Sequence, residues 1–176
     1  INVAMDGVFV ETQGQIFYER DLALLEGLRI MEIMHHSPSG SSGDYIELMN
    51  VSDKVLDMTG VRFTNGIDFT FPAMTLQPGE YTVVVDDLPT FRSLYGAGAG
   101  MAGQYGGNLS NDGEEIVLSL PLPMEAAVLR FKYNGAWYPD TNGGGNALVI
   151  NDPFAPPATW SQSQSWRAAA ASPGRP

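Results

Sequence analysis

Two glutamates stand at positions where the sequence pattern predicts apolar surroundings. Glu32 and Glu47 lie inside the alternating apolar runs 28–36 and 44–50, each of which has the pattern of a β-strand. Removing a carboxylate from water is costly unless it is paired or hydrogen-bonded. The pair is interpreted as a shared cation site, as an acidic contact surface, or as structural carboxylates that accept hydrogen bonds at a sheet edge. We favour the structural role, because ion-pair and hydrogen-bond networks also bury such groups; an arrangement in which both face solvent stays open.

A glycine-rich loop near residue 140 has the composition of a cation-binding turn. Asp140 and Asn142 follow the Asp-x-Asn-x-Gly pattern of calcium loops. The twelfth position of an EF-hand loop requires a glutamate, and Asn151 stands there instead. The pattern therefore favours an ordinary turn, and no cofactor is expected. If Ca²⁺ is bound, we expect Asp140, Asn142 and Asp152 to supply ligands together with backbone oxygens.

Two adjacent histidines follow the first apolar run. His35 and His36 lie near Ser37, Ser39 and Asp44 in the sequence, so a Ser-His-Asp triad can be drawn. Geometry and not chain proximity defines a triad, and the Gly-x-Ser-x-Gly motif is absent. Adjacent strand residues also point to opposite faces. We expect a surface pair of histidines and no enzymatic activity.

Aromatic residues in the second half of the chain suggest one further ligand class. Trp137, Tyr138 and Pro139, with Tyr133 and Tyr105, would form an aromatic platform for carbohydrate if they were exposed on one face. Large aromatic side chains more often fill a core, and we favour that role here.

Composition limits the classes of partner. The chain has 20 acidic and 9 basic residues among 176, a net charge of −11, which disfavours binding to phosphate backbones and suits divalent cations or basic partners. It has no cysteine, and so neither disulfides nor thiolate metal sites. No apolar run approaches the roughly 18 residues that span a bilayer. We expect a secreted fragment or processed product whose signal peptide lies outside this chain.

Strand-like segments recur along most of the sequence. Turn residues rich in Gly, Pro, Asn and Asp separate them, at the spacing of a sandwich or barrel. Ile30, Ile33 or its neighbours, Ile46 and Leu48 are expected to supply core. The predicted strands are 28–36, 44–50, 61–65, 69–71, 80–86, 115–120, 128–133 and 146–150.

Segments outside these strands carry other signals. Residues 86–96 predict a short helix, with an Asp cap, Pro89 in the first turn and Gly96 at the end. The glycine-rich residues 97–107 predict a loop. Before residue 28, we expect a hairpin of strands 8–10 and 15–18, then one helical turn or an extended connector over 20–27. The tail from Asp152 is expected to be held by Trp160 and Trp166 and to fray past residue 168.

Residues 28–176 resemble the lamin tail domain family in seven landmarks that occur in the family's order. Residues 1–27 lie outside the resemblance, and Val61 and Ala147 depart from the usual aromatic and Ser. The inserted helix and the glycine-rich segment resemble the bacterial branch. The landmarks are Ile30–Met34, Asp44–Asn50, Leu56–Val61, 69–72 with 76–81, Leu109–Glu114, Asp140–Leu148, and 165–168 with 172–174.

This resemblance implies an all-β, immunoglobulin-like β-sandwich over 28–176, with one short inserted helix. Residues 1–27 would be an N-terminal hairpin and linker, or the end of an upstream domain. The family implies no enzymatic activity. The expected function is a non-catalytic interaction or spacer module of a larger exported bacterial protein, extracellular or at the cell surface, acting through exposed sheet edges and loops. The alternative is a module that binds carbohydrate or Ca²⁺.

Overall fold

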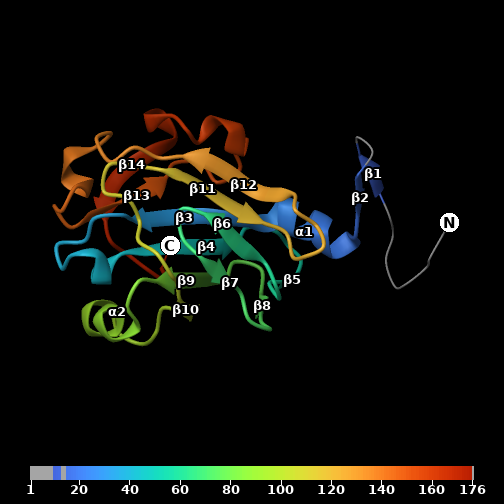
Figure 1. The fold of residues 1–176 in the computed structure, drawn as a ribbon, viewed down its shortest axis with the longest axis horizontal. Coiled ribbons are helices and arrows are strands. Elements are labelled where there is room, and N and C mark those ends of the chain that lie inside the picture. The colour runs from blue at the N-terminus through green and yellow to red at the C-terminus, as the bar shows by residue number, and fades with distance from the viewer. Residues whose placement is uncertain (1–9, 13–14, 176) are drawn as a thin grey trace.

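Two β-sheets packed face to face form the body of the protein in the computed structural model, which describes residues 10–12 and 15–175 (Figure 1). The larger sheet has six strands, and all of its neighbours are antiparallel except β10 and β9, which are parallel. Its order is β10 (Met101–Gln104), β9 (Tyr81–Val85), β4 (Tyr45–Asn50), β3 (Leu28–Met34), β13 (Asn146–Ile150) and β14 (Trp166–Ala170).

The smaller sheet has four strands and packs on one face of the larger sheet. A short two-stranded sheet, β5 (Leu56–Asp57) with β8 (Thr75–Leu76), lies at its side. This arrangement confirms the predicted all-β, immunoglobulin-like sandwich. Each of the eight predicted strands is present, with ends that differ by one or two residues at most. The order of the smaller sheet is β12 (Ala127–Lys132), β11 (Glu115–Ser119), β6 (Arg62–Asn65) and β7 (Phe69–Thr70).

The core lies between the two sheets. Ile30, Ile33, Ile46 and Leu48, the four residues predicted from the sequence, are all fully buried there. Ile30 and Ile33 are three positions apart, yet both point inward, because a β-bulge at Met31 shifts the register of β3 against β4. Burial of such side chains contributes about 1.5–3 kcal/mol each to folding.

Two helices and four 3₁₀ turns complete the described residues. Helix α2 (Leu88–Tyr95) confirms the predicted insertion: the side chain of Asp87 accepts a hydrogen bond from the Thr90 N–H at 2.8 Å, and Gly96 ends the helix at φ 81°. Within the described residues, no helix has the length and apolar character of a membrane span. The 3₁₀ turns are η1 (Ser41–Gly43), η2 (Pro139–Thr141), η3 (Pro157–Thr159) and η4 (Ser163–Ser165).

The N-terminal region contains the predicted hairpin, and its first strand continues past the predicted end at residue 10. Strand β1 (Val10–Thr12) pairs with β2 (Gln15–Phe17), while the predicted strand residues 8–9 and the turn at 13–14 lie outside the described residues. Residues 20–27, left open between helix and connector, lie in helix α1 (Glu19–Gly27). Leu24 of α1 is buried in the core. The assignment of residues 1–27 to a separate linker or upstream domain stays a prediction.

Four segments form strands that the sequence did not predict: the short strands β5 and β8, and the longer strands β10 and β14. Strand β10 lies within the glycine-rich stretch that was expected to be a loop. Strand β14 extends to Ala170 and pairs with the whole of β13, so the expected fraying past residue 168 is wrong. Alanine has a low β propensity, but pairing with β13 and the burial of Trp166 override it.

Candidate functional site

The face of the six-stranded sheet that points away from the core, here called the outer face, is covered unevenly. At one end, α2 packs Phe91 against Met34, Tyr45, Val83 and Val85. In the middle, the C-terminal segment (residues 171–175) donates hydrogen bonds to side chains of β3 and β4. At the other end, an apolar groove stays open. The three zones differ in what they can bind.

The middle zone contains the two glutamates. Glu32 of β3 and Glu47 of β4 are direct cross-strand neighbours, and their exposed fractions are 2% and 1%. Strands β3 and β4 are the two central strands of the sheet, so the carboxylates lie in its interior and not at an edge. The expectation of an edge position is therefore wrong, and neither residue faces solvent.

Hydrogen bonds from three residues surround this pair. The Tyr45 hydroxyl donates to Glu32 Oε1, and Ser172 donates to Glu32 through its backbone N–H at 3.2 Å and its hydroxyl at 3.3 Å. The backbone N–H of Gly174 donates to Glu47 Oε2. These contacts confirm the structural interpretation of the two carboxylates, because they anchor the C-terminal segment to the sheet.

Burial changes the proton affinity of both groups. Desolvation, with a smaller contribution from the charge of the neighbouring Glu32, raises the pKa of Glu47 to about 8, although the hydrogen bond from the Gly174 N–H opposes the shift. Desolvation also raises the pKa of Glu32, against hydrogen bonds from Tyr45 and Ser172 and the charge of Arg167. Burial therefore favours the protonated form of both groups, and a proton on the pair relieves the repulsion of two adjacent buried carboxylates.

The three residues named as Ca²⁺ ligands do not lie together. Asp140 is in η2, and the side chain of Asn142 forms a hydrogen bond with His36 Nδ1. Asp152 follows the opposite end of β13, which spans about 13 Å at the usual rise per residue. Among residues 10–12 and 15–175, no group of three or more His, Cys, Asp or Glu side chains is arranged to hold a metal ion. The Ca²⁺ site stays a prediction with no observed ligand cluster.

The histidines occupy different environments. His35 is fully buried and its Nε2 lies 3.3 Å from Thr141 Oγ1, so the expectation of a surface pair is wrong for this residue. Burial lowers the pKa of His35 to about 4, which keeps it neutral. Asp44 accepts a hydrogen bond from the Ser37 N–H at 2.7 Å. Within the described part of the chain, no hydrogen bond joins a histidine to Asp44 or to a serine, so the triad is not assembled.

The aromatic residues considered as a carbohydrate platform mostly belong to the interior. Tyr138 is half-buried, and its hydroxyl donates to the backbone carbonyls of Ser163 and Trp166. Tyr133 is fully buried, and Tyr105 has an exposed fraction of 5%. Trp137 is half-buried and packs against the main core. The preferred role in the core is confirmed for these residues, and they present no shared aromatic surface.

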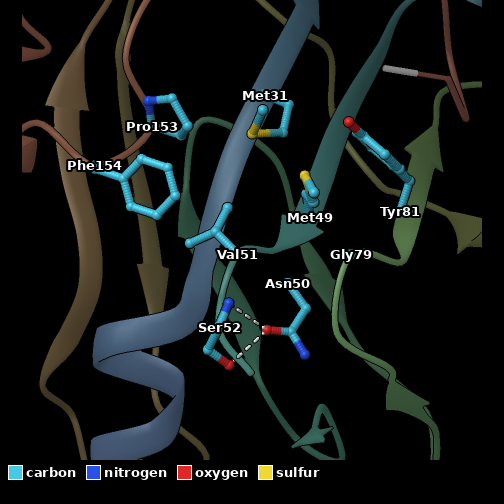
Figure 2. Close-up of a pocket in the computed structure, with 9 residues that line it drawn as sticks. All are labelled: Met31, Met49, Asn50, Val51, Ser52, Gly79, Tyr81, Pro153 and Phe154. Atoms are coloured by element: carbon cyan, nitrogen blue, oxygen red, sulfur yellow. Dashed lines mark hydrogen bonds between the residues drawn. The ribbon is translucent and has the colours of Figure 1, made fainter. Parts of the chain in front are cut away.

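The open end of the outer face contains the site that sequence reasoning missed. It is an apolar groove of about 290 Å³ on β3, β4 and β9 and the loop after β13. Figure 2 shows Met31 and Met49 between the ring of Phe154 on one side and that of Tyr81 on the other. Phe154 has an exposed fraction of 72%, the highest among the exposed large apolar side chains of the described residues. We call this feature the methionine groove; it is lined by Met31, Met49, Asn50, Val51, Ser52, Gly79, Tyr81, Pro153 and Phe154.

Local hydrogen bonds hold the walls of the methionine groove in place. Arg29 Nε donates to the Pro153 carbonyl at 3.0 Å, and Asp152 Oδ1 accepts from the Phe154 N–H at 2.9 Å. The floor depends on Asn50, which donates to the Leu76 carbonyl at 3.0 Å and accepts from Ser52, as Figure 2 shows. The groove is thus preformed by hydrogen bonds that need no ligand.

Acidic residues adjoin the lining residues of the methionine groove. Asp53, Glu80 and Asp152 are exposed, and each is next in sequence to a lining residue. Lys54 is exposed nearby. The guanidinium of Arg29 donates hydrogen bonds to backbone carbonyls. The signal that would have found the site is the pair Met31 and Met49, which are large apolar residues at positions of their strands that point away from the core.

The comparisons with known proteins assign the family. The model of the Lamin Tail Domain family matches residues 25–135, which include every strand from β3 to β12. Strands β13 and β14, which complete the larger sheet, follow the matched range. No curated protein and no solved structure matches the chain. Because the match covers well over half of the residues, the chain belongs to the lamin tail domain family, a family of non-enzymatic, immunoglobulin-like protein-interaction modules.

Proposed function

We propose that this protein is a non-catalytic interaction module of a larger exported bacterial protein, and that the methionine groove is its contact surface. The occupant we propose is a protein segment that presents an apolar side chain next to lysine or arginine. The observation that carries the proposal is the preformed apolar groove on a sheet face that is otherwise covered.

The lining of the groove supports an apolar anchor. Met31, Met49 and Tyr81 are only partly buried, and Phe154 is exposed, so an inserted side chain would remove apolar surface of the protein as well as its own. Full burial of one large apolar side chain contributes about 1.5–3 kcal/mol. Methionine side chains adapt to differently shaped partners, because they are unbranched and polarizable.

Charge supports the basic flanks of that segment. The chain has a net charge of −11, and Asp53, Glu80 and Asp152 lie around the groove. Rim charges of one sign mainly accelerate association and select partners of the opposite sign. The same charge repels nucleic acid, which we do not propose as a partner.

The exported, bacterial context rests on sequence features. The inserted helix α2 and the glycine-rich segment that follows it resemble the bacterial branch of the family. The absence of cysteine is compatible with an extracellular or cell-surface location. The Ca²⁺ and carbohydrate alternatives are tested by a thermal melt with millimolar Ca²⁺ and by a glycan array; a shift in Tm or a bound glycan would support the respective alternative.

Selection from a random peptide display library tests the groove. We expect enriched peptides to carry an aromatic or aliphatic residue beside Lys or Arg. Their binding should weaken at least tenfold for Met49→Glu and for Phe154→Ala. Leu94→Ala is the matched control, because Leu94 is also an exposed apolar residue but lies on α2. Enriched peptides that bind all variants equally would contradict the proposal.

A further inference from the structure

A second pocket lies on the opposite side of the sandwich, over the smaller sheet, and has different chemistry. Its volume is about 440 Å³. Two of the nine basic residues of the chain contribute to it, together with two threonines and two apolar residues. We call it the arginine pocket; it is lined by Arg20, Thr59, Gly60, Arg62, Thr70, Pro121 and Leu122.

The guanidinium of Arg62 is the unusual feature of this pocket. Its Nε is buried and has no hydrogen-bond partner. Among the residues that the structure describes, no hydrogen bond or ion pair engages any other atom of this side chain. Buried donors are nearly always satisfied in folded proteins, so a donor without an acceptor calls for an explanation.

The other charges near the pocket are already compensated. Arg20 Nη1 lies 3.6 Å from Asp57 Oδ2, and Arg20 Nε lies 3.7 Å from Asp21 Oδ1. Asp57 also accepts a hydrogen bond from the Thr59 N–H at 2.9 Å. A chain with 20 acidic residues thus leaves Arg62 without a carboxylate, while it gives Arg20 two.

The residues around Arg62 indicate which kind of ligand would satisfy its guanidinium. Thr70, its cross-strand neighbour on β7, offers a hydroxyl with no partner of its own in the described structure. Leu122 has an exposed fraction of 65% and forms an apolar wall with Pro121. A guanidinium matches the two oxygens of a carboxylate through parallel N–H donors. The two Nη groups of Arg62 have no partner in the described structure and, unlike Nε, are not among the fully buried atoms, so they can form this pair. An apolar group beside that carboxylate would cover Leu122.

We propose that the arginine pocket binds a carboxylate that belongs to an apolar protein segment, with Arg62 as the bidentate anchor. The carboxylate is either an acidic side chain next to an apolar residue or the free C-terminus of a chain that ends in an apolar residue. This site is independent of the methionine groove, because the two share no residue and lie on different sheets.

A set of capped dipeptides tests the site by NMR chemical-shift titration on the whole chain. Acetyl-leucyl-glutamyl amide presents a side-chain carboxylate, acetyl-glycyl-leucine presents a terminal carboxylate, and acetyl-leucyl-glutaminyl amide is the neutral control. We expect one of the two acids to shift the amides of Thr59, Gly60 and Thr70, and we expect the neutral peptide to bind at least fivefold more weakly. The acid that binds identifies the source of the carboxylate.

Variants separate a binding role from a structural one. Arg62→Gln should abolish the shifts, and Arg62→Lys should weaken binding because the bidentate geometry is lost. Arg92→Gln, an exposed arginine on α2, should change nothing. The Tm of Arg62→Gln should not fall appreciably, since the Arg62 side chain makes no hydrogen bond or ion pair in the described structure that the substitution would break.

Three results would overturn the proposal. If the neutral dipeptide bound as tightly as the acids, the pocket would not recognise a carboxylate. Equal or stronger shifts with inorganic phosphate would assign the pocket to phosphate instead. A large fall in the Tm of Arg62→Gln would show that Arg62 is a structural residue.

Discussion

The same two strands bury two carboxylates and leave two methionines uncovered. Glu32 and Glu47 are nearly inaccessible in the middle of the outer face, whereas Met31 and Met49, next to them on β3 and β4, line an open groove. This distribution is the reverse of what polarity alone predicts. The difference lies in the covering segment: residues 171–175 bring N–H and hydroxyl donors to the glutamates, and they do not extend over the methionines.

The contrast shows that side chains on one sheet face stabilise the fold where another segment covers them and are available to bind a partner where none does. Where α2 or the C-terminal segment covers the sheet, side chains contribute to folding. Where nothing in the described structure covers it, the side chains are available for a partner. Substitutions should therefore have effects on stability that decrease from the α2 end, through the glutamates, to the methionine groove.

The largest effect is expected at the end covered by α2. Phe91 is fully buried, and its ring centroid lies 5.5 Å from that of Tyr45 and 5.0 Å from that of Tyr95. Phe91→Ala should lower the free energy of unfolding by about 3–5 kcal/mol, because it leaves a cavity between helix and sheet. Urea unfolding measures the change. Leu94→Ala, on an exposed position of the same helix, is the control and should cost far less.

Removal of the C-terminal segment should convert the middle zone into an open one. Deletion from residue 171 onward removes the donors of Ser172 and Gly174 and leaves Glu32 and Glu47 short of partners. We expect a loss of about 2–4 kcal/mol in the free energy of unfolding. Arg175→Ala should have little effect, since Arg175 is exposed. A deletion as stable as the full chain would show that the glutamates do not depend on this segment.

The pH dependence of stability should report the buried pair. The folded-state pKa of Glu47 is raised to about 8, so between about pH 5 and pH 8 the folded state binds more protons than the unfolded state. The free energy of unfolding should therefore fall as pH rises through this range. Asp44, whose pKa burial raises to about 7, contributes a fall of the same sign.

Glu47→Gln removes one source of this dependence while it keeps an oxygen that can accept from the Gly174 N–H. The variant should show a flatter profile of the free energy of unfolding between about pH 5 and pH 8, with the remaining slope due in part to Asp44. Urea titrations at three pH values measure the slope. A slope equal to that of the unchanged protein would mean that Glu47 does not titrate in this range.

The smallest effect on stability is expected at the methionine groove. Phe154→Ala should change the free energy of unfolding by about 0.5 kcal/mol or less, because the side chain is 72% exposed. The same variant should lose binding to peptides selected for the groove. A strong destabilisation with unchanged binding would assign Phe154 to the fold and would remove the contrast between the open and covered zones.

Sequence periodicity predicted a sandwich or a barrel, because most strands place alternate residues in one core, and the family resemblance favoured the sandwich. Ile46 and Leu48 follow the period of two, and α2 was found from Asp87, Pro89 and Gly96, whose effects are local. Strand β14 was missed because Ala168–Ala170 have no local preference for a strand and depend on pairing with β13. Local signals thus gave the elements, and contacts distant in sequence decided the exceptions.

The candidate sites were harder to predict because they depend on which distant segments of the chain pack over the strands. Glu32 and Glu47 were identified as unusual, but two of their three donor residues, Ser172 and Gly174, lie 140 and 127 positions away along the chain. His35 was predicted to lie on the surface because the residues next to it in the sequence do not indicate its contact with Thr141, which is 106 positions away. The methionine groove needs both the position of the C-terminal segment and the loop that carries Phe154, and neither follows from periodicity.

The bulge at Met31 has a consequence for how sequences of this family are aligned. Before it, the even-numbered residues Leu28 and Ile30 point into the core; after it, the odd-numbered Ile33 does. At Met31 the inward-facing positions of the strand therefore change from even-numbered to odd-numbered residues. An alignment that closes a gap at this position would match core residues of one protein with surface residues of another. A relative without the extra residue would keep its counterparts of Ile30 and Ile33 in the core and its two glutamates paired, but by regular alternation along the strand.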